Sequence, residues 1–266
     1  MENIYRIYTF LLGLCVGSFL NVCIYRIPLE KSVVAPRSHC PQCDRFLKWY
    51  ENIPLFSYII QGGKCRHCKK WISMRYPLVE LLTGVLSLMV CLKFGWGLSY
   101  ALYFLLFVAP MVAITFIDLD HQIIPDVFSL TGILSGILTV FFTMDAPGVL
   151  WWEKLLFSGK GILLGGGSLL AVSWIYEKLR KQEGIGGGDI KLAAMFGAFF
   201  GWKGVLMILF LSSFLGSVVG VFLMVVYRKG LKLVIPFGPF LATASLIYLF
   251  FGNQILQWYL NRLLLR

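Results

Sequence analysis

Long apolar stretches constrain the fold of this chain more than any other feature of its sequence. About eight of them occur within 266 residues, of which 58% are hydrophobic, and the mean hydropathy is +0.78. A soluble domain of this size cannot bury so much apolar surface, whereas a helix of roughly 20 apolar residues can cross a bilayer. The sequence therefore predicts an all-α polytopic membrane protein with about eight transmembrane helices. The expected spans are 7–25, 77–94, 98–117, 127–143, 159–176, 189–201, 204–226 and 237–258.

The distribution of basic residues indicates how these spans are oriented. Of the 24 Lys and Arg residues, 17 fall in alternate loops or within two residues of one, a bias that is typical of cytoplasmic loops. Membrane orientation and attraction to anionic membrane lipid account for the net charge of +11, so we expect no nucleic-acid partner. The loops expected in the cytoplasm are 26–76, 118–126, 177–189 and 227–236.

One polar segment, residues 28–75, interrupts the series of apolar stretches. It contains Cys40 and Cys43, and then, after an interval of 21 residues, Cys65 and Cys68. Two CxxC pairs at this spacing favour a four-thiolate zinc site of ribbon type, and stable disulfides are disfavoured on the cytoplasmic side. A domain of this size has too small a hydrophobic core to fold without a stabilising metal site or disulfides. We therefore expect a small zinc-ribbon-like domain between the first and second spans; four reduced cysteines without metal are the alternative.

Two acidic residues lie where lipid is expected. Asp118 follows the apolar run 107–117, and Asp189 follows the glycine-rich tract 184–188 and leads into another apolar run. Carboxylates at membrane depth are costly and usually mark functional sites. Two carboxyl groups that share a proton can act as base and acid, as in aspartyl proteases. We therefore predict that Asp118 and Asp189 form a catalytic pair, with Gly186 and Gly188 in an active-site loop that admits an extended peptide.

Three further acids are weaker candidates for this site. Asp120 is expected either to support the pair or to be solvated. Asp126 follows Pro125 at the start of a helix, where a negative charge is favourable, and it is the alternative to Asp118 as the first catalytic acid. Glu80 lies near a span start and is expected to neutralise Arg75, to cap its helix or to face the cytoplasmic domain.

Taken together, these motifs resemble those of the bacterial prepilin peptidases, which are bifunctional leader peptidases and N-methyltransferases. The resemblance covers nearly the whole chain, and the order and spacing of the motifs are its specific part. The matching segments are 17–22, 25–28, the two cysteine pairs, 49–58, 75–80, 117–126, 184–192 and 235–239. At one position the chain departs from the family pattern, because the variable residue before Gly188 is also glycine.

The resemblance implies a GxGD-type aspartyl intramembrane protease with Asp118 and Asp189 as its pair and zinc on the four cysteines. It implies cleavage of the short basic leader of type IV prepilins or pseudopilins after a glycine, at the cytoplasmic face of the bacterial inner membrane. S-adenosylmethionine then donates a methyl group to the new amino terminus. These activities serve type IV pilus, type II secretion and competence systems. Neither the client, the system nor the oligomeric state follows from the sequence.

The resemblance also assigns functions to parts of the chain. Residues 1–27 form the first span, 28–75 the cysteine-rich domain associated with methyl transfer, and 76–266 the membrane-embedded peptidase. Within the cysteine-rich domain, Gly63 and Lys64 are our candidates for residues that methyl transfer needs. No dinucleotide-type glycine fingerprint occurs there, so the methyl-donor site depends on the resemblance alone.

Three alternatives remain at the sequence level. An ion-coupled transporter would also carry intramembrane Asp residues and glycine-broken helices, although it usually shows internal repeats and midplane sites. A peptidase without methyltransferase activity is the second, although peptidase-only relatives lack the cysteine-bearing domain. A zinc-ribbon membrane adaptor with structural acids is the third.

Overall fold

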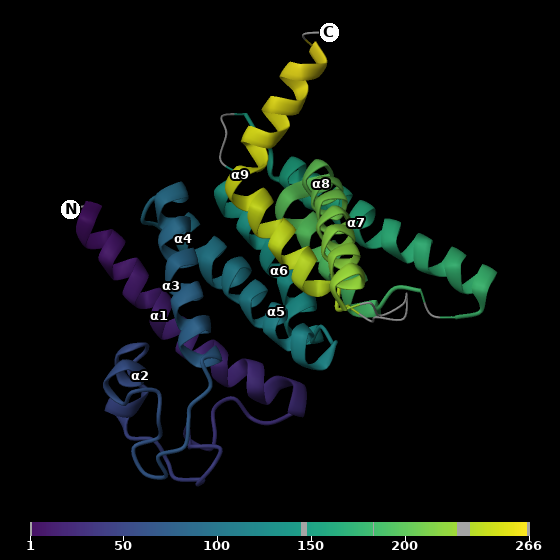
Figure 1. Ribbon diagram of the computed structural model, residues 1–266. Helices are drawn as coiled ribbons and strands as arrows, with labels where there is room; N and C mark the ends of the chain where they lie inside the picture. The colour runs from purple at the N-terminus through teal and green to yellow at the C-terminus, as the bar shows by residue number, and fades with distance from the viewer. Residues whose placement is uncertain (1, 145–147, 183, 228–234, 265–266) are drawn as a thin grey trace. The chain divides into compact units, whose positions relative to one another are not determined.

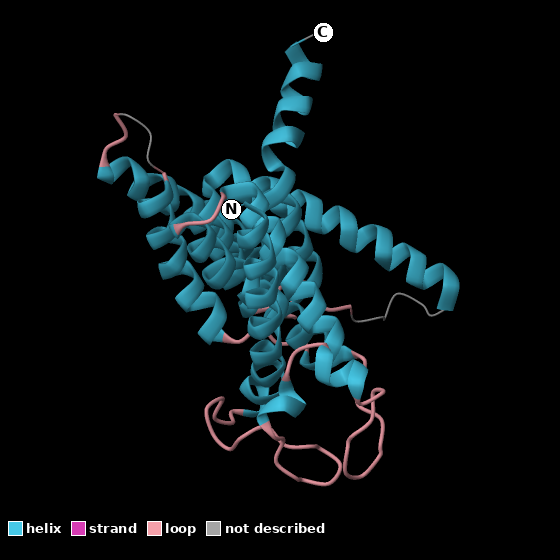
Figure 2. Ribbon diagram, turned by 90° about the vertical axis from the view of Figure 1, so that its left-hand side faces the viewer, coloured by secondary structure: helices cyan, strands magenta, loops and turns pink. Residues whose placement is uncertain are grey.

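The computed structural model describes residues 2–144, 148–182, 184–227 and 235–264 of the chain. Within these ranges the regular structure is helical and no strand forms (Figure 2). The chain divides into two compact units, Met1–Ile117 (unit 1) and Asp118–Arg266 (unit 2). The predicted division into 1–27, 28–75 and 76–266 concerns function and stays a prediction.

Seven helices in the described ranges are long and apolar enough to cross a membrane, which confirms the all-α polytopic prediction. By length and composition they are Glu2–Leu29, Arg75–Phe94, Leu98–His121, Asp126–Thr143, Trp151–Arg180, Gly187–Val226 and Gly238–Trp258.

The difference between about eight expected spans and seven observed helices arises at Gly201. The expected spans 189–201 and 204–226 both lie in α8, Gly187–Tyr227. Gly201 interrupts α8 with φ 67° and ψ −175°, a conformation that glycine adopts readily and other residues rarely do. The helical segment before this break is only roughly 20 Å long, which is shorter than the hydrocarbon core of a bilayer. The sequence thus located two helical segments that form one kinked helix.

Unit 1 is built on α1, Glu2–Arg26, and α3, Arg75–Phe94, which lie side by side (Figure 1). The helices α4, Leu98–Tyr103, and η3, Phe104–Val108, then continue into α5, Ala109–His121. A buried hydroxyl links the first two helices, because Ser87 Oγ donates to the Thr9 carbonyl at 2.7 Å. Such interhelical hydrogen bonds are a usual means of association where lipid replaces water.

The segment between α1 and α3 is mostly irregular (Figure 2). It contains only three short helices, η1 at Ile27–Leu29, η2 at Trp49–Asn52 and α2 at Phe56–Ile60. The two cysteine pairs lie in turns with the same hydrogen bonds: Cys40 N–H donates to the Arg45 carbonyl at 3.0 Å, and Cys65 N–H to the Lys70 carbonyl at 2.9 Å. The structure therefore confirms a small domain with two matching knuckles between the first and second spans.

Unit 2 contains α6, Asp126–Thr143, α7, Trp151–Arg180, α8 and α9, Gly238–Leu264. Helices α7 and α8 approach closely at Gly161 and Gly197, where a Cβ on either residue would collide with the other's backbone. Next to this crossing, Ser158 Oγ donates to the Ala198 carbonyl at 2.9 Å. Most of the expected loop 227–236 lies outside the described residues.

Candidate active site and metal centre

Asp118 ends an otherwise apolar helix as a buried acid. It lies in the last turn of α5 with 5% of its surface exposed, and its Oδ2 accepts a hydrogen bond from Gly238 N–H at 2.9 Å. The donor comes from the first residue of α9, where helical N–H groups have no intrahelical partner. The start of one helix thus fixes the carboxyl group at the end of another.

Gly238 is required at this contact because there is no room for a side chain. An added Cβ would lie 2.6 Å from Asp118 Oδ2 and 3.0 Å from its Cγ. Gly238 lies in the matching segment 235–239 but was not predicted as a site residue. The glycine between Phe237 and Pro239 was the available signal, although the acid that it contacts is distant in sequence.

Asp189 lies in the first turn of α8, so the positive end of the helix dipole is beside it. Its N–H donates to the Gly186 carbonyl at 3.1 Å. Its Oδ1 is buried and has no hydrogen-bond partner among the described residues. The Asp189 carboxyl group interacts electrostatically with that of Asp118, so unit 2 brings the two predicted catalytic acids together.

The glycine tract allows the segment before α6 to come close to Asp189. A Cβ on Gly188 would lie 2.8 Å from Ile124 Cβ, whereas one on Gly187 would meet nothing within 4 Å. A Cβ on Gly186 would lie 3.4 Å from Asp189 Oδ2, which is ordinary contact. Of these three positions, only that of Gly188 has no room for a side chain.

The remaining candidate acids lie outside this pair. Asp126 forms an ion pair with Lys191, with Oδ1 and Nζ 2.6 Å apart and both side chains substantially exposed. Asp120 is exposed. Glu80 belongs to unit 1, where it is 8% exposed and its Oε2 accepts a hydrogen bond from Leu55 N–H at 2.8 Å. Of the three roles expected for Glu80, the structure shows contact with the cysteine-rich domain.

The four cysteines of that domain form a single cluster. The sulfurs of Cys40, Cys43, Cys65 and Cys68 all lie within 4.8 Å of one another, and Cys40 Sγ is 4.0 Å from Cys68 Sγ. Tetrahedral zinc with Zn–S bonds of about 2.3 Å places its sulfur ligands about 3.8 Å apart. The spacing of the sulfurs therefore fits a zinc ion.

Two thiols of the cluster differ in how readily they ionise. Burial raises the pKa of Cys40 to about 11. Hydrogen bonds from the backbone N–H groups of Cys68 and His67 lower the pKa of Cys65 to about 7. Thiolates are the form that binds zinc, and knuckle N–H groups directed at sulfur stabilise that form.

The two predicted methyl-transfer residues lie at the start of the second knuckle. Gly63 has φ +69°, and a Cβ there would lie 2.9 Å from the Tyr58 hydroxyl. Lys64 Nζ lies 4.5 Å from the centre of the Trp71 ring. Both positions support the shape of the knuckle, and their part in methyl transfer stays a prediction.

Comparison with known proteins gives matches along most of the chain. A family model described as the bacterial peptidase A24 N-terminal domain matches residues 11–94, and one described as the type IV leader peptidase family matches residues 105–221. No solved structure matches this chain.

Several curated proteins named prepilin leader peptidase/N-methyltransferase are similar to it. The one from Myxococcus xanthus is 43% identical over 223 residues, which span 83% of this chain and 64% of that protein. The one from Aeromonas salmonicida is 37% identical over 282 residues, which span 96% of this chain and 94% of that protein. The one from Pseudomonas aeruginosa is 38% identical over 276 residues, which span 95% and 92%.

Proposed function

Because this chain belongs to the type IV leader peptidase family, we propose that it cleaves the short basic leader of prepilins or pseudopilins and methylates the amino terminus that cleavage exposes. The observation that carries the peptidase activity is the electrostatically coupled pair of Asp118 and Asp189 in unit 2. One carboxylate of the pair takes a proton from water, and its protonated partner donates to the carbonyl oxygen or the leaving amine. No covalent intermediate is needed.

The position of the pair suits a substrate that is anchored in the membrane. Asp118 lies near the end of the span Leu98–His121, and Asp189 near the start of the span Gly187–Val226. A prepilin has a basic leader followed by an apolar helix, so its scissile bond lies at the membrane interface. In the tract before Asp189, Gly188 packs against Ile124, whereas a Cβ on Gly187 would meet nothing within 4 Å, so we place the extended backbone of the substrate on the side of Gly186 and Gly187.

The second activity requires a methyl donor, for which we propose S-adenosylmethionine. The donor supplies an electrophilic methyl group on a sulfonium sulfur. The amine lone pair of the new amino terminus forms the C–N bond as the C–S bond breaks, the bonding electrons pass to sulfur, and the amine releases a proton to solvent. Unit 1 contains a pocket with polar and apolar walls that is large enough for such a donor.

We propose that zinc, held by Cys40, Cys43, Cys65 and Cys68, is structural. Four thiolates fill a tetrahedral zinc shell and leave no open position for a reactant. The domain between α1 and α3 has little regular structure, so the metal would supply much of its folding free energy. Gly63 and Lys64 would then act on methylation through the knuckle that they shape.

For localisation, we propose the bacterial inner membrane with the cysteine-rich domain in the cytoplasm. The seven apolar helices make this a multi-pass membrane protein, and the basic loop 26–76 supports the orientation. Thiols stay reduced on the cytoplasmic side, as a thiolate site requires. The clients would be pilins or pseudopilins of a type IV pilus, type II secretion or competence system.

The test is to purify the protein into lipid nanodiscs with a tagged prepilin and to determine the amino terminus of the product by mass spectrometry. We expect cleavage after a glycine and, when S-adenosylmethionine is present, the added mass of one methyl group. An uncut prepilin, or a cut elsewhere, would contradict the peptidase assignment. A cut product that never gains a methyl group would leave the peptidase without the methyltransferase.

Asp126→Asn is the control for the choice of the first catalytic acid. Asp126 is exposed and paired with Lys191, so this variant should retain cleavage at close to the wild-type rate. If it is inactive while Asp118→Asn is active, Asp126 replaces Asp118 in the pair. No comparison supports the transporter alternative, whereas the match to the N-terminal domain over residues 11–94 supports the bifunctional enzyme over a peptidase alone.

A further inference from the structure

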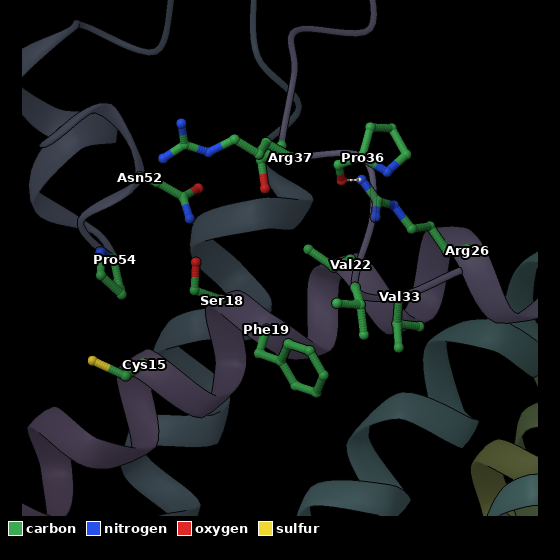
Figure 3. Close-up of a pocket in the computed structure, with 12 residues that line it drawn as sticks. Cys15, Ser18, Phe19, Val22, Arg26, Val33, Pro36, Arg37, Asn52 and Pro54 are labelled. Atoms are coloured by element: carbon green, nitrogen blue, oxygen red, sulfur yellow. Dashed lines mark hydrogen bonds between the residues drawn. The ribbon is translucent and has the colours of Figure 1, made fainter. Parts of the chain in front are cut away.

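A pocket of about 470 Å³ in unit 1 takes no part in the aspartate pair or the cysteine cluster. One wall is the face of α1 that includes Cys15, Ser18, Phe19 and Val22, and the rest comes from the cysteine-rich domain (Figure 3). Arg26 at the end of α1 also lines the pocket. The lining residues from the cysteine-rich domain are Val33, Val34, Pro36, Arg37, Ser38, Asn52 and Pro54.

Arg26 holds the segment 32–36, which forms part of the pocket wall, in place. Its side chain is 6% exposed, with Nη1 donating to the Ser32 carbonyl at 3.0 Å and Nη2 to the Pro36 carbonyl at 2.7 Å. The guanidinium thus ties the segment 32–36 to the end of α1. A wall that is fixed by a buried cation is preorganised, which lowers the cost of binding a ligand.

The polar groups of the pocket are varied in charge and hydrogen-bonding type. The Arg37 guanidinium is exposed and has no hydrogen bond or ion pair within the part of the chain that the structure describes. The Asn52 amide and the Ser18 hydroxyl point toward each other from opposite sides (Figure 3). With Ser38, and with Arg26 already bonded to two carbonyls, these groups give one available cation, one amide and two hydroxyls beside apolar residues that include Phe19.

A buried acid lies behind this arrangement. The Ser18 hydroxyl interacts with the Glu80 carboxyl group, which also accepts the Leu55 N–H hydrogen bond. Leu55 has φ 59°, a costly conformation for leucine, so this contact holds the backbone next to Pro54 in an unusual shape. The pocket therefore has a cation among its lining residues and an acid behind Ser18.

We propose that this pocket binds the methyl donor S-adenosylmethionine, an inference that rests on the proposed function and gives it a site. The donor carries a carboxylate, which Arg37 can bind in a charge-assisted hydrogen bond, and a sulfonium cation, which the acid behind Ser18 attracts. Its adenosine can use the Asn52 amide and the hydroxyls of Ser18 and Ser38. The volume lies within the usual range for ligands of this size, about 300–1,000 Å³.

A phospholipid headgroup is the competing ligand, because its phosphate could also bind Arg37. The observations favour the donor, since a phosphodiester offers only acceptor oxygens, whereas the adenine amino group and the ribose hydroxyls can also donate to the amide oxygen of Asn52 and to the serine hydroxyls. Figure 3 shows Ser18 beside Phe19 and Asn52 near Ser18, so the pocket offers polar groups next to an aromatic side chain, as binding of an adenine ring requires.

The test measures binding directly, with full-length protein in nanodiscs of phosphatidylcholine and with titration calorimetry of S-adenosylmethionine. The same titration with S-adenosylhomocysteine, which lacks the sulfonium charge, measures the contribution of the acid. The variants are Arg37→Ala, Val22→Trp, which fills the apolar side of the pocket, and Lys31→Ala. The last removes a cation from the same loop outside the pocket, and its side chain lies over Tyr25.

We expect Arg37→Ala to weaken binding of the donor about tenfold, as loss of a charge-assisted contact does, and Val22→Trp to weaken it at least as much. Lys31→Ala should bind like the wild type, and S-adenosylhomocysteine should bind more weakly than the donor. Zinc content and the fraction of cleaved pilin that carries a methyl group are measured on each variant, so that a folding defect is recognised by lost zinc.

Three results would overturn the proposal. If Arg37→Ala and Val22→Trp both bind the donor like the wild type, while the wild type methylates pilin, the donor binds elsewhere and the proposed function stands. The pocket would instead be a lipid site if native mass spectrometry of the wild type in phosphatidylglycerol shows a bound lipid that the Arg37→Ala variant lacks, while this variant binds the donor like the wild type. A wild-type protein that neither binds the donor nor methylates would remove the methyltransferase activity along with the pocket, and cleavage would then be judged by its own assay.

Discussion

Gly238→Ala provides a direct structural test of the aspartate pair without altering either carboxyl group. The new Cβ would lie 2.6 Å from Asp118 Oδ2, whereas ordinary contact begins at 3.4 Å. The carboxyl group must therefore retreat by about 0.8 Å, and a displacement of about 1 Å in a catalytic group can lower the rate about 100-fold. We expect kcat/KM for leader cleavage to fall roughly 10- to 100-fold.

The same substitution should leave the fold largely intact. It weakens one hydrogen bond, from Gly238 N–H to Asp118, which contributes about 1 kcal/mol. Expression level, zinc content and detergent-solubilised stability should therefore stay close to those of the wild type. This separates a misplaced carboxyl group from an unfolded protein.

Gly187→Ala is the matched control, because it changes a glycine beside the other acid where an added Cβ meets nothing within 4 Å. The assay is the initial rate of cleavage of a tagged prepilin at several substrate concentrations. Wild-type kcat/KM for Gly238→Ala, or an equal loss for Gly187→Ala, would refute the argument that the first residue of α9 positions Asp118.

Three further predictions concern the two sites. Asp118→Asn and Asp189→Asn should each lower leader cleavage at least about 100-fold and leave the protein in the membrane, because an amide cannot share the proton; near-normal processing would remove that residue from the pair. Purified protein should contain about one zinc per chain, and Cys40→Ser with Cys65→Ser should lose it together with the folded domain, since such binding supplies on the order of 10 kcal/mol; elemental analysis that finds no metal in the wild type would refute the site. Gly63→Val should reduce the methylated fraction of product more than the cleaved fraction, because it strains a residue at φ +69°; an equal loss of both would contradict separate activities.

The order of the helices followed from the sequence because each apolar stretch predicts its own helix without reference to the rest of the chain. A run of apolar residues must be helical in lipid, since every backbone group then bonds within its own segment. The sequence also indicated the cysteine cluster, because two CxxC pairs contain enough ligands without any other part of the chain. The expected boundary between 189–201 and 204–226 coincides with the break at Gly201, but the sequence did not show that the two segments form one kinked helix, since a glycine between apolar runs is compatible with a kink or with two separate spans.

The acids show where sequence reasoning reached its limit. Asp118 and Asp126 occur in one short segment, and both were reasonable candidates from composition. The tertiary structure gives them different surroundings, because it pairs Asp126 with Lys191 and places Asp118 against Gly238, and the choice of Asp118 stays a prediction. Glu80 is a similar case, since its contact with Leu55 depends on how the cysteine-rich domain folds back on α3.

The sequence by itself therefore determined the membrane class, the cluster of four cysteines and the presence of two acids at span ends, since each of these depends on residue type and local spacing. The tertiary structure alone decided that Gly238 touches Asp118, that the two carboxyl groups interact, and that Ser18, Arg37 and Asn52 line one pocket. These contacts join residues far apart in the chain. Their existence is fixed by the packing of helices and loops, which no single segment encodes.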